Sequence, residues 1–150
     1  MSWSAPFDEL QEGWEFATGA RTVQAADVLS FGELTGDLHP QHVDAEWAAA
    51  SPFGEQIAHG MLLLSYAVGL APFDPERVLA LRRLREFVFK RPVRLGDTIA
   101  VRGRLAGLQP LDDASGLVRC RLSILNQREE LCARGEIELI WRRQPALEAR

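Results

Sequence analysis

One short stretch, residues 34–47 (LTGDLHPQHVDAEW), concentrates side chains that can move protons. Asp37 and His42 stand five positions apart, and on a continuous helix this spacing would turn their side chains roughly 140° from each other. Pro40 cannot continue a helix that begins at Asp37, and Gly36 is a typical stop for a preceding helix. We therefore expect both side chains to project from a loop between two helices. There a carboxylate and an imidazole can hold one water and move its protons.

Two other interpretations of this stretch are open. The same residue types are common in polar turns, with Asp44 as the N-cap of the next helix. A metal site is also conceivable, because carboxylates and imidazoles are common ligands. The candidate ligands are Asp37, His39, His42, Asp44 and His59. Their spacing matches no familiar zinc pattern and includes no cysteine, so we expect no metal.

A second stretch, IAHGMLLLS, places Gly60 where an apolar helix begins. The first N–H groups of a helix have no intrahelical partner and lie at the positive end of its dipole. Because glycine has no side chain, a substrate carbonyl can approach these donors closely, which predicts an oxyanion site. The alternative is that Gly60 only allows tight packing of the helix on a sheet.

Hydrophobic periodicity indicates the elements that must position these residues. Residues 22–36 predict a helix with Thr22 as its cap, and residues 45–51 predict a short helix. Residues 60–70 are apolar on nearly every face, which is typical of a helix enclosed by the rest of the protein. The expected strands are a region within residues 13–23 and the segments 78–93, 98–105, 117–125 and 131–141.

The later strand segments alternate apolar and polar residues, as half-buried antiparallel strands do. In the last one, Ile137 and Leu139 oppose Glu136 and Glu138. The pattern predicts an α+β fold in which an antiparallel sheet covers the apolar helix.

Length and composition indicate one globular domain over residues 1–150, with 47% hydrophobic and 25% charged residues. We expect loosely ordered tails at about residues 1–11 and 143–150. The net charge of −4 does not suggest nucleic acid as a partner, and no apolar run is long enough to predict a membrane span. The two cysteines form no CxxC pair and no signal peptide is visible, so we expect a cytoplasmic protein.

Taken together, the two stretches resemble the hydratase motif of the MaoC-like family, which includes (R)-specific enoyl-CoA hydratases and 3-hydroxyacyl-carrier-protein dehydratases. The family pattern is Gly-Asp-x-Asn-Pro-x-His-x-Asp, followed by His-Gly-Met, and it corresponds here to residues 36–44 and 59–61. The resemblance covers roughly residues 12–142. It implies a hotdog fold, in which a curved antiparallel sheet wraps a long central helix. It also implies a homodimer formed by continuation of the sheet, with a dimer of dimers or a heterodimer as alternatives.

The resemblance further implies hydration of trans-2-enoyl thioesters, or the reverse dehydration, on acyl-CoA or an acyl-carrier protein and without a cofactor. Asp37 and His42 would hold the water, and the Gly60 N–H would polarise the thioester carbonyl. The other residues that the motif places around the substrate are His39, Pro40, His59 and Met61. The chain departs from the family at His39, where the pattern has Asn. A histidine there can still donate a hydrogen bond, and it can titrate.

Three cations at a strand end and the following turn, Lys90, Arg91 and Arg94, are candidates for contacts to a phosphopantetheine or nucleotide phosphate. The alternative for them is a solvated strand edge. Two other functions are open. One is a hotdog thioesterase, in which the same water attacks the thioester carbonyl. The other is a non-catalytic subunit of a heteromeric dehydratase.

Overall fold

The structure, a computed structural model, describes residues 1–143. Along the chain, a start with two short strands is followed by helices and then by long strands. The elements are η1 (Phe7–Glu9), β1 (Glu15–Ala17), β2 (Arg21–Thr22), α1 (Ala25–Thr35), α2 (Pro40–Val43), α3 (Ala45–Ala49), α4 (Gly60–Leu70), β3 (Val78–Phe89), β4 (Thr98–Pro110), β5 (Ser115–Leu125) and β6 (Leu131–Arg142). This order confirms the order expected from periodicity.

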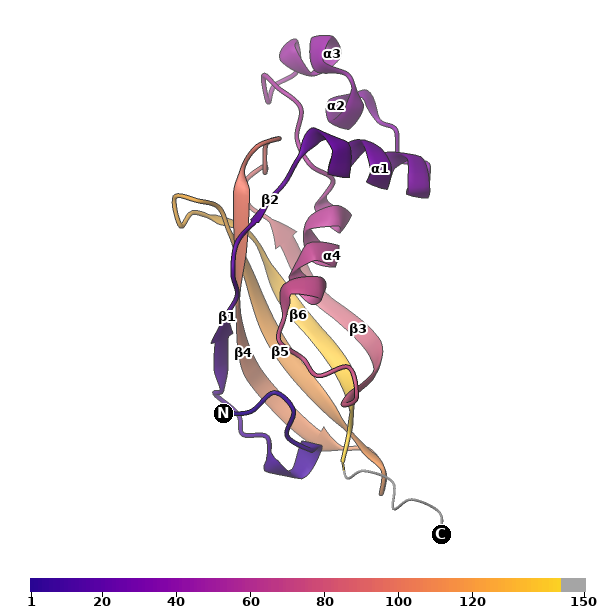
Figure 1. Cartoon of the computed structure of the whole chain (residues 1–150), viewed down its shortest axis with the longest axis vertical. Helices are drawn as coiled ribbons and strands as arrows, with labels where there is room; N and C mark the ends of the chain where they lie inside the picture. The colour runs from indigo at the N-terminus through magenta and orange to yellow at the C-terminus, as the bar shows by residue number, and fades with distance from the viewer. Residues whose placement is uncertain (144–150) are drawn as a thin grey trace.

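The antiparallel sheet has the strand order β1-β4-β5-β6-β3, and β2 pairs with β4. Figure 1 shows the sheet curving around α4, which lies along its concave face. The helix buries Leu62, Leu63, Leu64 and Ala67 in the core that it shares with the sheet. The α+β class and the enclosed central helix are therefore confirmed. No helix among residues 1–143 is long and apolar enough to cross a membrane.

The expected alternation holds along most of β4, β5 and β6, but consecutive residues are buried in places, as at Cys132 and Ala133. Glu138 belongs to the polar face of β6 by its position, yet it is buried at 4% exposure. The strand lies between β5 and β3, and Arg119 and Arg83 stand directly opposite Glu138 on the two sides. Its carboxylate pairs with Arg82. The long side chain of Arg82 on the neighbouring strand β3 therefore covers a charge that the alternation places in solvent.

The prediction of a loosely ordered N-terminal tail is wrong. Ala5, Phe7 and Leu10 are buried, because this segment covers the end of the core opposite α1–α3 (Figure 1). The indole N–H of Trp141 donates to the Ala5 carbonyl at 2.9 Å and ties the segment to β6. At the other tail, Arg143 is also held, since its guanidinium lies 2.6 Å from the Asp8 carboxylate. Residues 144–150 lie outside the described residues.

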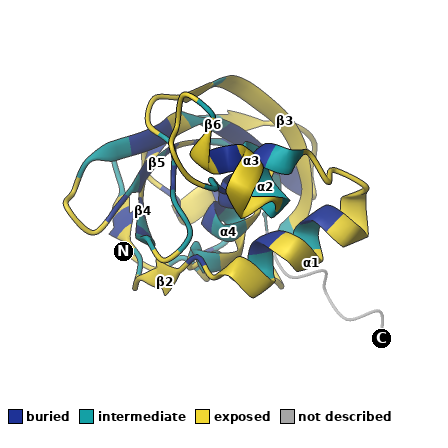
Figure 2. Cartoon of the chain, turned by 90° about the horizontal axis from the view of Figure 1, so that it is seen from above, coloured by how far each residue is buried: buried dark blue, intermediate teal, exposed yellow. Residues whose placement is uncertain are grey.

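The three short helices lie over the N-terminal end of α4, and Figure 2 views them from above. The first of them, α1, begins after Gln24, which forms a capping box with Asp27. The expected cap, Thr22, lies instead in β2, because pairing with β4 extends the strand up to that residue. Gly36 ends α1 in the left-handed conformation (φ 82°), as its residue type predicts.

Candidate active site

The segment that carries Asp37 and His42 is partly helical. Asp37 lies between α1 and α2, whereas His42 lies on α2. The prediction that both project from a loop is therefore wrong for His42. Pro40 causes the difference, because at the first position of a helix its missing N–H leaves no bond unmade and its fixed φ favours the turn.

His39 is the residue before α2, and its side chain caps the helix. The Gln41 N–H donates to His39 Nδ1 at 3.0 Å. The side chain of Ser, Thr, Asp or Asn is the usual N-cap acceptor at a helix start. The imidazole is exposed and its edge meets the ring of Trp47, with 5.3 Å between centroids. Residue type suggested a hydrogen-bond donor at this position, but the ring nitrogen acts as an acceptor.

Backbone carbonyls orient the other two histidines. His42 Nδ1 lies 2.7 Å from the Ile57 carbonyl oxygen, and His59 Nε2 lies 2.8 Å from that of Asp37. A carbonyl only accepts, so these nitrogens carry the protons, and His42 Nε2 and His59 Nδ1 keep their lone pairs. Within residues 1–143, the buried Nδ1 of His59 has no hydrogen-bond partner. His42 is thus held in the tautomer whose Nε2 can act as a base.

The described chain contains one cluster of three potential metal ligands, formed by Asp37, His42 and His59. One ligand-type atom of each lies within 4.8 Å of the others. The rings of His42 and His59 are stacked, however, with 3.8 Å between centroids and 27° between planes. Imidazole lone pairs lie in the ring plane, so rings stacked in this way direct them side by side rather than toward one ion. The arrangement suits proton transfer better than metal coordination.

Burial lowers the pKa of His42 below the ordinary value of 6.5. The neighbouring His59 and His39 act in the same direction, since a second positive charge nearby disfavours protonation. The Ile57 carbonyl and the Asp37 carboxylate oppose this shift without reversing it. His42 is therefore neutral at neutral pH and able to accept a proton.

A cavity of about 460 Å³ joins these groups to the start of α4. Its polar side includes Asp37, His42, His59 and the main chain of Gly60. The apolar residues that line it are Phe53, Ile57, Ala58, Met61, Leu63, Phe89, Pro92 and Val93. His39 and Pro40, which the motif places around the substrate, are not among the lining residues. A carboxylate and two imidazoles thus face a cavity whose lining is largely apolar, as is typical of small-molecule sites.

The N-terminus of α4 is open. His59 precedes the helix, but its side chain makes no capping hydrogen bond. The first N–H groups of α4 can therefore donate to another acceptor. The ring of Phe89 packs against Gly60 so closely that a Cβ there would lie 2.8 Å from ring carbons. Both interpretations of Gly60 are therefore compatible with the structure, since the glycine allows tight packing against Phe89 and begins a helix without a side-chain cap.

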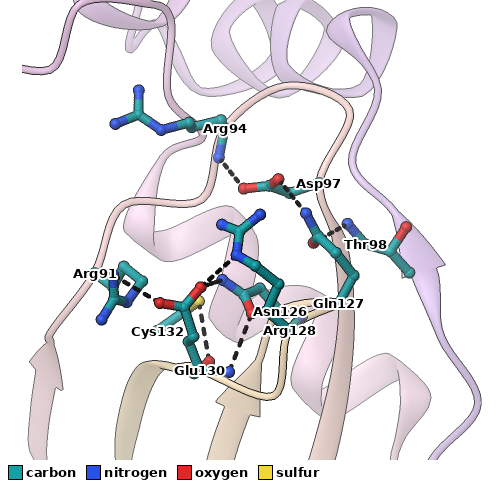
Figure 3. A network of polar contacts seen from close by, with 9 residues as sticks. All are labelled: Arg91, Arg94, Asp97, Thr98, Asn126, Gln127, Arg128, Glu130 and Cys132. Atoms are coloured by element: carbon teal, nitrogen blue, oxygen red, sulfur yellow. Dashed lines mark hydrogen bonds and ion pairs between the residues drawn. The ribbon is translucent and has the colours of Figure 1, made fainter.

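Lys90 and Arg91 line the same cavity, as a phosphate contact would require. Arg91 lies 2.8 Å from Glu130, and Arg128 lies 2.6 Å from the same carboxylate (Figure 3). The hydrogen bond from Arg128, with another from Asn126, lowers the pKa of Glu130. Two guanidinium groups therefore share one carboxylate, so Glu130 is not a partner of Arg91 alone.

Arg94, the third predicted phosphate contact, is directed elsewhere. Its guanidinium lies 2.9 Å from Glu55 and donates to the Phe53 carbonyl at 2.8 Å. Its main-chain N–H donates to Asp97 at 2.9 Å, within the turn between β3 and β4 (Figure 3). Arg94 thus fastens that turn to the segment before α4 and does not line the cavity.

Two residues of the site carry no signal in their residue types. Ile57 orients His42 through its main-chain carbonyl, which any residue would supply. Phe89 covers Gly60 from the end of β3 and is distant from it in sequence. Only the pairing of β3 with β6 brings it there, so a local motif search cannot find it.

Comparison with known proteins identifies the family of the chain. A family model described as MaoC like domain matches residues 10–124. An (R)-specific enoyl-CoA hydratase from Rhodospirillum rubrum is 34% identical over 107 residues, which are 69% of this chain and 72% of that protein. Protein MaoC from Klebsiella aerogenes is 41% identical over 97 residues, but this 64% of the chain spans only 29% of that longer protein.

Among solved structures, a monoamine oxidase regulatory protein from Archaeoglobus fulgius superposes with a TM-score of 0.87 at 35% identity. The match covers 97% of this chain and 100% of that one. The chain belongs to the MaoC-like domain family, and its sheet wrapped around α4 is the hotdog fold that the motif implies.

Proposed function

We propose that this protein hydrates trans-2-enoyl thioesters with (R) specificity, or carries out the reverse dehydration of 3-hydroxyacyl thioesters. One observation carries the proposal: a carboxylate, a neutral imidazole and an uncapped helix N-terminus meet on one largely apolar cavity. The names of the related proteins, which include hydratases and dehydratases, support the same reaction.

In the hydration direction, Asp37 and His42 hold one water. The water oxygen bonds to C3 of the enoyl group while His42 Nε2 takes its proton, and the C=C electrons move to the thioester oxygen as an enolate. The N–H of Gly60 stabilises that oxygen, a contribution of about 3 kcal/mol for one such donor. The same Nε2 then returns the proton to C2, so no group outside the site is consumed. The second hydrogen stays on the oxygen and becomes part of the C3 hydroxyl; Asp37 accepts a hydrogen bond from it and so orients the attack.

The acyl group would be carried on CoA or on an acyl-carrier protein. Both present a phosphorylated pantetheine arm, and Lys90 and Arg91 supply positive charge to the lining of the cavity. Arg128, which shares Glu130 with Arg91, adds to the positive charge. This part of the proposal rests on charge alone.

We also propose a dimer that continues the sheet at β3. In the described chain this strand pairs only with β6, and long apolar strand edges are normally covered in soluble proteins. Its exposed apolar residues are Leu79, Leu81, Leu84, Val88 and Phe89. Phe89 also lines the cavity, so a partner chain at this edge would complete the wall of the site.

The test is to incubate purified protein with crotonyl-CoA and follow the loss of enoyl absorbance, for the wild type and for His42→Ala. We expect turnover by the wild type only, with (R)-3-hydroxybutyryl-CoA as product. Release of free thiol instead would assign the protein as a thioesterase. No turnover of any enoyl chain length, on CoA or on carrier protein, would sink the enzyme assignment and favour a non-catalytic subunit.

A further inference from the structure

We propose that His39 is a positioning residue that couples the placement of His42 to pH. A neutral imidazole caps α2, and a protonated one cannot. The inference rests on the proposed function for its effect on activity, but the cap itself is independent of any reaction.

The helix that carries His42 has little stability of its own. It is four residues long, so few of its hydrogen bonds lie within the helix. The cap bond from the Gln41 N–H to His39 Nδ1 satisfies a donor of its first turn. Gln41 is buried at 6% exposure, so solvent replaces that bond poorly.

The other side of α2 is fastened to the segment before α4. The Gln41 side chain donates to the Glu55 carbonyl at 2.9 Å, and His42 Nδ1 donates to the Ile57 carbonyl at 2.7 Å. The Gln56 side chain donates to the His42 carbonyl at 2.9 Å. These bonds fix the helix toward α4, whereas the His39 cap fixes the end nearest Asp37. Loss of the cap therefore changes the separation of the catalytic pair.

Protonation reverses the role of His39 Nδ1. The cap needs a lone pair on this nitrogen, and both nitrogens of an imidazolium are donors. Two N–H groups would then face each other across 3.0 Å. The groups around the ring are His42 of α2, with 6.1 Å between centroids, and Trp47 of α3, which does not titrate in this range. The charged neighbours in sequence are Asp37 before the ring and Asp44 after α2.

Two variants separate capping from titration. His39→Asn keeps an acceptor that cannot be protonated, and His39→Ala removes the acceptor. At pH 8 we expect equal kcat/KM on crotonyl-CoA for the wild type and His39→Asn, and a value about fivefold lower for His39→Ala, the size of a typical lost cap. At pH 5 the ratio of wild type to His39→Asn should fall to about one fifth, because an imidazole can be protonated and an asparagine side chain cannot. An equal decline of the two proteins with pH would overturn the proposal.

A second readout does not need activity. Hydrogen exchange at the Gln41 amide, followed by NMR, reports the cap directly. After correction for the intrinsic effect of pH, its protection should be lost by pH 5 in the wild type and retained in His39→Asn. Protection that is insensitive to pH in both proteins would also overturn the proposal, even if no thioester is turned over. Loss of turnover with a pH-sensitive Gln41 amide would instead contradict the proposed function alone.

Discussion

His39 and His59 both immediately precede a helix, but only His39 caps its helix with its side chain. At α2, the imidazole nitrogen takes up an N–H of the first turn. At α4, the ring turns away to donate to the Asp37 carbonyl, and the first N–H groups stay free. The same residue type thus closes one helix terminus and leaves the other open.

The difference matches what each helix has to do. α2 carries His42, and the cap from His39 stabilises this four-residue helix. α4 is held by burial of its apolar side chains, so its terminus can remain without a cap and serve an external acceptor. The N–H groups at a helix start therefore have different partners in the two helices. In α2 a side chain of the protein accepts from one of them, and in α4 they are left for an external acceptor. His59 connects the start of α4 to α2, because its ring stacks on that of His42 and donates to the main-chain carbonyl of Asp37.

The largest expected effect comes from replacing His42 on α2, the helix that His39 caps. His42→Gln keeps a polar side chain of similar size on α2 but removes the proton carrier. We expect kcat for hydration of crotonyl-CoA to fall about 10³-fold, within the usual range for general acid–base groups. Circular dichroism and thermal melting of the variant should match the wild type. A loss below tenfold with an intact fold would mean that His42 does not carry the proton.

A smaller effect is expected at the open end, where the N–H itself can be removed. Gly60→Pro deletes this donor, and proline is well suited to the first helical position. His59 already has an extended backbone (φ −60°, ψ 137°), as a residue before proline requires. We expect kcat about 10²-fold below that of Gly60→Ala.

Gly60→Ala is the matched control, because its Cβ disturbs Phe89 in the same way but leaves the N–H in place. Equal rates for the alanine and proline variants would show that this N–H does not stabilise the transition state. The two helix termini would then differ in capping but not in function.

Local sequence patterns predict most residues of this site, but they do not predict that α2 is capped by a side chain and α4 is not. Proline, glycine and the polar residues around His42 define α2 and the end of α1, and the apolar run 60–70 defines α4. Whether a histidine before a helix caps it depends on its ring direction, which tertiary contacts decide. For His59 the deciding partner is the Asp37 carbonyl, which only the packing of α1 over α4 brings within reach.

The same limit explains the errors at the fold level. The apolar residues of the N-terminal segment follow no clear helical or strand period, but the segment covers an open end of the core that exists only once the sheet has formed. Glu138 follows the polar alternation and is nevertheless buried, with its carboxylate paired to Arg82 of the neighbouring strand β3. Both cases depend on which strands become neighbours, and strand order is not a local property of the sequence.

The protonation of His42 gives a further test of the comparison. Burial lowers the pKa of His42, so its base form persists below the ordinary imidazole value of 6.5. In His39→Asn, where the cap does not titrate, kcat/KM should stay level from pH 8 to about 6.5 and fall only at lower pH. A pH–rate profile of this variant measures it, and an acid limb centred above 6.5 would contradict the assignment of His42 as a buried base.

Burial of His42 also affects stability. A histidine whose pKa is depressed in the folded state binds fewer protons there than in the unfolded chain, so protons favour unfolding. The free energy of unfolding should therefore decrease as the pH falls below about 6.5, the ordinary imidazole value in the unfolded chain. Replacement of His42 by Gln should reduce this decrease in denaturant titrations at pH 5 and pH 8.

The smallest expected effect concerns the part of the substrate that neither helix terminus contacts. Lys90→Met removes a positive charge that lines the cavity. We expect KM for crotonyl-CoA to rise about fivefold with little change in kcat, the behaviour of a contact made equally in the ground and transition states. The increase should shrink at high salt, because exposed charges are screened.

Arg102→Met is the matched control for Lys90→Met, since it removes one exposed charge from a surface pair with Glu129, outside the cavity. It should leave KM unchanged. A crotonyl thioester of pantetheine without phosphate should bind the wild type and Lys90→Met equally well. If Lys90→Met weakens that thioester as much as crotonyl-CoA, Lys90 shapes the cavity rather than contacting a phosphate.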